Sequence, residues 1–182
     1  MNPILELDQE LFIWLNNFGA KQFDSFWLLV SSTSIWIPLY AIFVYLLYKE
    51  YRLRNLLFLL LFIALGVTVS DQLANIFKYG MERLRPCHEP SIEGMFREVK
   101  CGGPYGFYSA HASNTFFLAS YLFFFLKRRL GWSVFLLFVW SAAVAYSRVY
   151  LGVHYPLDIL YGALVGFFLG GLFATLARKT LR

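Results

Sequence analysis

The sequence is poor in charge. Of its 182 residues, 15% are charged and 59% are hydrophobic, whereas an ordinary soluble domain has about a quarter charged and about half apolar residues. This composition argues against an ordinary soluble domain and favours a membrane protein. The chain also has no internal repeat, no low-complexity tract and no sign of a second domain. We therefore expect residues 1–182 to form a single membrane-embedded domain.

No cleavable signal peptide is evident either. The first 20 residues carry Glu6, Asp8 and Glu10 where a signal peptide would carry basic residues. We expect residues 1–25 to form an amphipathic helix at the membrane surface, with Asp8 or Asn2 as a candidate cap. A frayed polar tail is the alternative.

Long apolar runs fill most of the remaining chain. They are Trp27–Tyr48, Asn55–Phe77, Ala112–Leu126, Leu130–Ser147 and Ile159–Ala177. A helix needs about 20 apolar residues to cross a bilayer core. The runs therefore predict an all-α, polytopic helix bundle over residues 27–177, with about five transmembrane helices and an outward loop at residues 78–110.

The basic residues are distributed unevenly between the two faces that five spans create. One face carries nine basic residues and one acid, Glu50, while the other carries seven basic residues and nine acids. Basic loops stay in the cytoplasm, so we expect the N-terminus and the loop at 78–110 to face outward. In a bacterial inner membrane this face is the periplasm. The net charge of +5 then reflects topology, and we expect no nucleic-acid partner.

Cysteine is scarce. The two cysteines, Cys87 and Cys101, both lie in the outward loop, and disulfides persist in oxidising compartments. We expect them to form a disulfide, with two free thiols as the alternative. His88 is adjacent to Cys87, but the spacing of a zinc site is missing, so no metal is expected there.

Polar residues of the outward face fall into three clusters, residues 78–86, 108–113 and 147–158, and each adjoins the end of an apolar run. Helix ends on one side of a bundle can share a pocket. Lys78, Arg85 and Arg148 would supply three cations there, and Ser109 could cap a helix whose N-terminus attracts anions. The combination describes a phosphate site, although any one of these cations taken alone could be a membrane-surface anchor.

Two histidines, His111 and His154, belong to the same clusters and can titrate near neutral pH. Asp158 follows His154 by four residues, so in a helical turn its carboxylate would face the imidazole. This arrangement orients one ring nitrogen and leaves the other free to attack. Pro156 suits the first turn of the helix that begins there.

In these residues the chain resembles the type 2 phosphatidic acid phosphatase family, within the vanadium haloperoxidase superfamily. The family signature is K-x6-RP, then PSGH, then SR-x5-H-x3-D. Its first part matches Lys78 and Arg85-Pro86, and its third part matches Ser147-Arg148, His154 and Asp158. In the second part Ser109 and His111 match, while Tyr108 and Ala110 replace proline and glycine. The resemblance spans roughly residues 55–177.

The resemblance implies a role for each matched residue. His154 would form a phosphohistidine, Asp158 would orient it, and His111 would protonate the leaving oxygen. The phosphate would be held by Lys78, Arg85, Arg148, Ser109 and the Ala110 N–H. No metal and no cofactor are implied.

The expected function is hydrolysis of a phosphate monoester or diphosphate on a lipid headgroup. We favour undecaprenyl diphosphate, because it must be dephosphorylated on the outward face, with phosphatidylglycerol phosphate and lipid A phosphates as alternatives. A non-catalytic lipid transporter is the rival class, which Asp71 within a span would suit. Expected partners are a phospholipid or isoprenoid phosphate and the bilayer. The sequence does not address the oligomeric state.

Overall fold

The computed structural model describes residues 3–181, and within them every regular element is a helix. The α-helices are α1 (Pro3–Asn17), α2 (Asp24–Ser31), α3 (Ile37–Glu50), α4 (Leu53–Met81), α5 (Ala110–Leu130), α6 (Leu136–Tyr150) and α7 (Pro156–Thr180). Across residues 3–181 the only β pairing is a single bridge between Leu84 and Tyr105. The expected all-α class is confirmed.

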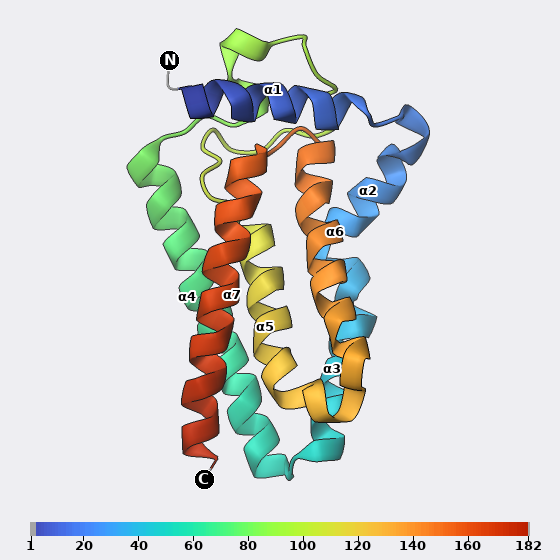
Figure 1. Cartoon of the computed structure of the whole chain (residues 1–182), viewed down its shortest axis with the longest axis vertical. Coiled ribbons are helices and arrows are strands. Elements are labelled where there is room, and N and C mark those ends of the chain that lie inside the picture. Colours follow the sequence, from blue (N-terminus) through green and yellow to red (C-terminus); the bar gives the residue numbers. More distant parts are fainter. Residues whose placement is uncertain (1–2, 182) are drawn as a thin grey trace.

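Four long helices, α4 to α7, run side by side along the long axis of the molecule, with α5 between its neighbours (Figure 1). The segments Lys21–Ser31 and Thr33–Glu50, which contain α2 and α3, lie beside α6 and meet at a bend of 64°. Pro38 lies in the first turn of α3, where its missing N–H costs nothing. α1 lies across one end of the bundle (Figure 1).

The chain is a multi-pass membrane protein. Three stretches of the described residues are long and apolar enough to cross a membrane, and a fourth is added if the bent pair forms one span. One of the three, Ala110–Tyr150, contains both α5 and α6, which run in opposite directions (Figure 1). The number of crossings, expected to be five, therefore stays a prediction.

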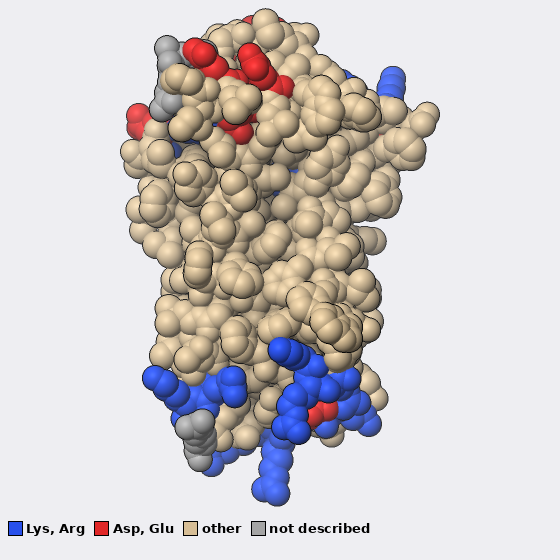
Figure 2. Space-filling model, in the orientation of Figure 1, with Lys and Arg blue, Asp and Glu red and all other residues tan. Residues whose placement is uncertain are grey.

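Charge separates to the two ends of the molecule. Lysine and arginine gather at the end where α7 finishes, and most of the acidic residues in view gather at the end covered by α1 (Figure 2). A belt without visible charge lies between them (Figure 2). The basic end holds the loops α3–α4 and α5–α6, as the sequence pattern predicted.

The N-terminal segment forms a helix across the bundle end, but α1 ends at Asn17, short of the residue 25 that the sequence predicted, and the short turn Lys21–Phe23 and α2 follow it. Asp8, Phe12 and Asn16 of α1 are buried, one turn apart, while Leu7 and Trp14 are exposed. The Asn16 amide donates to the carbonyls of residues 149 and 150 at 3.1 and 2.9 Å, which ties α1 to the end of α6. Asp8 does not cap its own helix, because it is a buried residue in the middle of α1. The other candidate cap, Asn2, lies outside the described residues.

Helices α5 and α7 pack backbone against backbone. Gly162, Gly166 and Gly170 are one turn apart on the buried face of α7, and a Cβ atom at Gly166 would lie only 2.1 Å from the Ser113 carbonyl oxygen. Small residues at such spacing allow membrane helices to approach closely. The close approach fixes the start of α5 beside the start of α7.

Gly166→Ala should therefore destabilise the protein by about 1–3 kcal/mol, the usual cost of overpacking a tight contact. Gly171→Ala is the matched control, because its Cβ would meet nothing nearer than a Phe124 ring carbon at 3.7 Å. Thermal unfolding in detergent measures both variants. Equal melting temperatures for the two would contradict the close packing.

Candidate active site

The three polar clusters of the sequence meet at the end of the bundle covered by α1. They supply Lys78 from the last turn of α4, Arg85 from the following loop, Ser109 to His111 from the start of α5, Arg148 from the end of α6, and His154 and Asp158 from the α6–α7 junction. The groups are close enough for their charges to interact. Arg85 and Arg148 interact electrostatically with Lys78, and Arg148 and His154 with His111. Every residue that the motifs predicted is thus brought together.

His154 and Asp158 form the centre of the site. His154 Nδ1 lies 3.4 Å from Asp158 Oδ2, and the Tyr155 N–H donates to the same oxygen at 3.0 Å. Both side chains are buried, with 2% of His154 exposed. α7 begins at Pro156, so Asp158 lies in its first turn. Because Nδ1 faces the carboxylate, Nε2 is the nitrogen left for chemistry.

Burial is the main influence on the charge of His154. Desolvation lowers the pKa of this imidazole to about 4, although Asp158 acts in the opposite direction and Arg148 and Arg85 in the same one. The ring is therefore neutral at neutral pH and keeps a lone pair. Below about pH 6.5 the unfolded chain binds a proton that the folded chain excludes, so stability falls as the pH falls from 6.5 toward 4.

The imidazole of His154 should titrate with a midpoint near pH 4 in NMR spectra of ring-labelled protein in detergent. The His154→Gln variant identifies its resonance among the three histidines of the chain. A midpoint at or above 6.5 would show that burial does not control this ring.

The cations around the imidazole are held by their own neighbours. Arg148 Nη1 donates to the Ser31 hydroxyl, while its buried Nε has no partner. Arg85 Nε donates to the Tyr105 carbonyl at 3.0 Å, and burial lowers the pKa of its guanidinium. A buried donor without an acceptor is costly. An anion bonded to Arg148 would remove this cost.

The start of α5 adds a helix N-terminus. Ser109 is the N-cap, with its hydroxyl 3.5 Å from the Ala112 nitrogen, and its own N–H donates to the Asp158 carbonyl at 3.0 Å. Ala110 is the first helical residue. Among residues 3–181, Glu82 is the only non-glycine with positive φ, so the alanine that replaces the family's glycine adopts a conformation natural to it. The unpaired N–H groups of such a turn attract anions.

Several residues near the site were missed in the sequence. Arg83 donates to Asp158 Oδ1 at 2.8 Å. The Lys100 charge acts on His111. A Cβ at Gly106 would lie 3.1 Å from Asp158 Oδ2, and one at Gly102 would lie 2.6 Å from an Arg85 nitrogen. Arg83 lies inside the K-x6-RP motif at a position that the motif leaves free, so the motif gave no signal for it.

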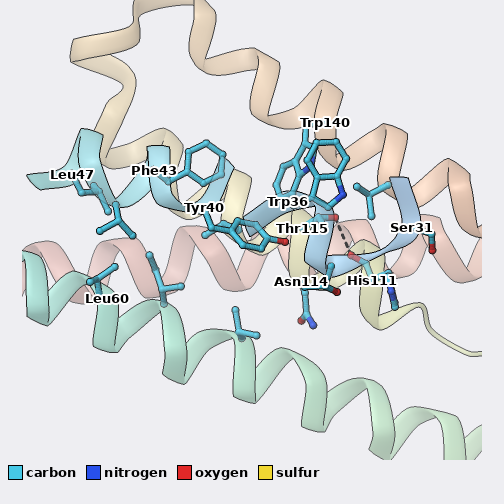
Figure 3. Close-up of a pocket in the computed structure, with 16 residues that line it drawn as sticks. Ser31, Trp36, Tyr40, Phe43, Leu47, Leu60, His111, Asn114, Thr115 and Trp140 are labelled. Atoms are coloured by element: carbon cyan, nitrogen blue, oxygen red, sulfur yellow. Dashed lines mark hydrogen bonds between the residues drawn. The ribbon is translucent and has the colours of Figure 1, made fainter. Parts of the chain in front are cut away.

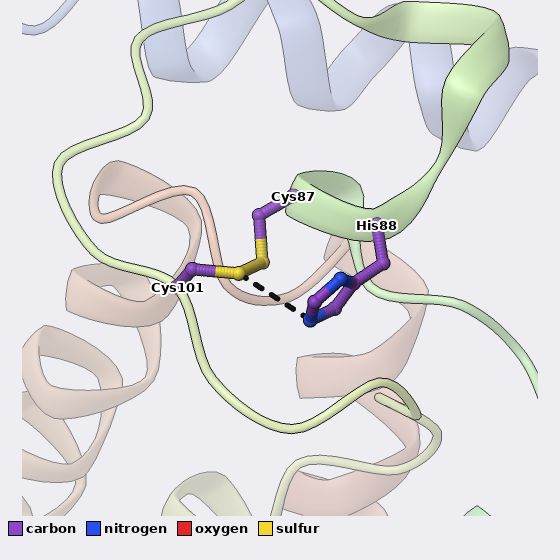
Figure 4. Close-up of side chains that lie close together, drawn as sticks. All are labelled: Cys87, His88 and Cys101. Atoms are coloured by element: carbon purple, nitrogen blue, oxygen red, sulfur yellow. Dashed lines mark hydrogen bonds between the residues drawn. A yellow bond between two sulfur atoms is a disulfide. The ribbon is translucent and has the colours of Figure 1, made fainter.

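Cys87 and Cys101 form a disulfide, which confirms the expectation (Figure 4). It ties the residues that follow Arg85 to those that precede Ser109. A disulfide that closes about 15 residues contributes roughly 3 kcal/mol in the chain-entropy model. His88 Nε2 lies 3.4 Å from Cys101 Sγ. The three side chains have the ligand types of a zinc site, but bonded sulfurs do not offer the thiolates that zinc binds.

An apolar groove begins at the site. It has a volume of about 350 Å³ and runs from His111 and Ser31 to Leu47 and Leu60, between α3, α4, α5 and α6 (Figure 3). At its far end the lining residues Leu47 and Leu60 belong to the apolar helices α3 and α4. A phosphate bound near His111 would thus have apolar space beside it for a lipid tail.

Residues 55–182 match the family model described as the PAP2 superfamily. The chain belongs to this family. It is 35% identical to a lipid A 4'-phosphatase of Bacteroides thetaiotaomicron, over 96% of this chain and 78% of that one. It is 33% identical to a putative undecaprenyl-diphosphatase, YbjG, of Escherichia coli, over 57% of this chain and 52% of that one.

The fold also matches a solved structure, a transmembrane PAP2 type phosphatidylglycerolphosphate phosphatase from Bacillus subtilis. The TM-score is 0.75 at 22% identity, covering 98% of this chain and 88% of that one. The family resemblance seen in the motifs is thereby confirmed, and this PAP2 protein is a hydrolase of lipid phosphates. In the sequence, Asp71 had suggested a transporter. In the structure it lies on the same helix as Lys78, close enough for the two charges to attract each other.

Proposed function

We propose that this PAP2 phosphatase removes a phosphate monoester from an acylated glycolipid of the lipid A class, at the periplasmic face of a bacterial inner membrane. The observation that carries the proposal is the position of His111, which belongs to the phosphate site and also lines the apolar groove. The similarity to the Bacteroides relative over 96% of this chain supports the choice of lipid.

The first half of the reaction transfers the phosphoryl group to His154. Its Nε2 attacks phosphorus, and the bond from phosphorus to the lipid oxygen breaks as the N–P bond forms. Asp158 accepts a hydrogen bond from the Nδ1–H of the ring and stabilises the positive charge that develops on it. His111, protonated when the phosphate dianion is bound beside it, donates that proton to the departing lipid oxygen, so that the dephosphorylated lipid leaves as an alcohol.

The second half returns the enzyme to its initial state. His111, now without its proton, accepts one from a water molecule whose oxygen attacks phosphorus, and the N–P bond breaks to release inorganic phosphate. Throughout, Lys78, Arg85 and Arg148 and the N–H groups at Ser109 and Ala110 bind the phosphate oxygens and stabilise the charge developing on them. These groups supply the charge that a metal ion supplies in other phosphatases, so we propose a metal-independent reaction.

Undecaprenyl diphosphate, which the sequence led us to favour, is the second candidate. The relative YbjG supports it, but over 57% of this chain only. A single groove suits one long prenyl chain as well as one acyl chain, so the test must compare the two lipids directly.

Purified protein, assayed for phosphate release with EDTA present throughout, should act faster on lipid A phosphates than on undecaprenyl diphosphate or phosphatidylglycerol phosphate. His154→Ala should reduce release by at least about 1,000-fold, the scale of losing a nucleophile, while His88→Ala, an exposed histidine of the disulfide loop, should retain it. Faster turnover of undecaprenyl diphosphate would replace the proposed substrate. Activity that survives His154→Ala would overturn the covalent mechanism, and inactivation by EDTA would overturn metal independence.

The proposed orientation predicts which cysteines a membrane-impermeant maleimide can reach in intact cells. Glu10→Cys on α1 should react, and Arg128→Cys at the end of α5 should react only after the membrane is permeabilised. The native cysteines give no background, because they are bonded to each other. The opposite pattern would place the site in the cytoplasm.

A further inference from the structure

Arg83 connects two buried carboxylates at the end of the bundle. Its Nη1 donates to Asp158 Oδ1 at 2.8 Å, and its Nη2 donates to Asp8 Oδ2 at 2.6 Å. The guanidinium carbon also lies 4.2 Å from the centre of the Tyr155 ring. Asp8 belongs to α1 and Asp158 to α7, so one side chain joins the helix across the bundle end to the helix that carries the active site.

Asp8 makes a second link to the same place. Its Oδ1 accepts the N–H of Leu157, in the first turn of α7, at 2.9 Å. The first N–H groups of a helix have no partner within the helix, so Asp8 acts as a cap supplied by another helix. The start of α7 is thereby held by α1 both through its backbone and through Arg83.

The two carboxylate oxygens of Asp158 contact different partners. Oδ2 faces His154 Nδ1 and the Tyr155 N–H, while Oδ1 faces Arg83. The bonds on the two oxygens together fix the plane of the carboxylate. Without Arg83, the Asp158 carboxylate, which has no exposed surface, would lose the one ion pair with a permanent cation that it has among residues 3–181. It could then rotate away from the imidazole.

We propose that Arg83 is a positioning residue for the phosphatase reaction, and that Asp8 of α1 anchors it. Arg83 holds the Asp158 carboxylate in the plane that orients His154, and Asp8 holds the guanidinium and the start of α7. The chain from α1 to the nucleophile is Asp8, Arg83, Asp158, His154. This inference rests on the proposed role of His154 as the nucleophile.

Arginine suits this task because its planar fork can bond two carboxylates at once, whereas lysine offers a point charge. Arg83→Gln removes the charge and Arg83→Lys keeps it without the fork. The matched control is Asp24→Asn, which breaks the Arg97–Asp24 ion pair at the same end of the molecule. Its N–O distance of 2.6 Å equals that of the Arg83–Asp8 pair. The Arg97–Asp24 pair does not contact Asp158.

Arg83→Gln should lower kcat by about 10- to 100-fold, the range for misplacing a reacting group by about 1 Å. KM should change less than about threefold, because the phosphate-binding cations are intact. The inhibition constant of vanadate, an oxyanion that competes for the same cations, should change equally little. Arg83→Lys and Asp8→Asn should lower kcat less, and Asp24→Asn should leave it unchanged. The NMR midpoint of His154, whose charged neighbours are Asp158, Arg148 and Arg85, should fall in Arg83→Gln, because a carboxylate that has turned away no longer raises the pKa of the ring.

A double-mutant comparison separates positioning from folding. In an Asp158→Asn background, Arg83→Gln should cost less than about twofold in kcat, since its effect passes through the carboxylate. Equal costs in both backgrounds, or an unchanged kcat in Arg83→Gln, would overturn the inference.

If Arg83→Gln fails to bind vanadate, Arg83→Lys and Asp8→Asn decide by the same criteria. Loss of activity in His154→Ala beside normal activity in Arg83→Gln would refute the positioning role alone, whereas activity in His154→Ala would refute the proposed function.

Discussion

Asp158 is a carboxylate without exposed surface, and a buried charge persists only where partners offset its loss of water. Its partners are a guanidinium, a backbone N–H and an imidazole. Each comes from a different segment of the fold: Arg83 from the loop after α4, Tyr155 from the residue before α7, and His154 from the α6–α7 junction. The carboxylate can satisfy all three only if these segments keep their places, so the charge balance of one side chain constrains the whole end of the bundle.

The backbone contact between α5 and α7 keeps two of those segments in place. Gly166 lies against the Ser113 carbonyl, and closer to the site the Ser109 N–H bonds the Asp158 carbonyl. The start of α5, which offers N–H groups to an anion, thus lies directly beside the start of α7, which carries Asp158. The disulfide then limits the freedom of the long loop that brings Arg85 over them.

The sequence predicted those features that depend on local chemistry. Apolar runs predicted the helices, and two cysteines in the outward loop predicted the disulfide. The motif spacing predicted that Lys78 and His154 lie in one place, and both lie near His111. It did not reveal Arg83 or Asp8, because their importance arises from contacts across 75 residues or more of chain. Asp8 was even interpreted as a candidate cap of its own helix, since an acid in the first turns is common there. The groove was equally hidden, because a cavity is a property of packing between helices.

The charges of the site favour an anion. Three cations lie close together, one of them has a buried donor with no acceptor, and burial disfavours the charged form of the His154 imidazole. A phosphate brings the negative charge and the oxygens that these groups lack, and the groove accepts the tail that comes with it. Because the charges are already fixed by the surrounding fold, little reorganisation is needed as charge moves during the reaction. The proposed function uses both features, since one molecule that carries a phosphate and an apolar tail matches the cations and the groove together.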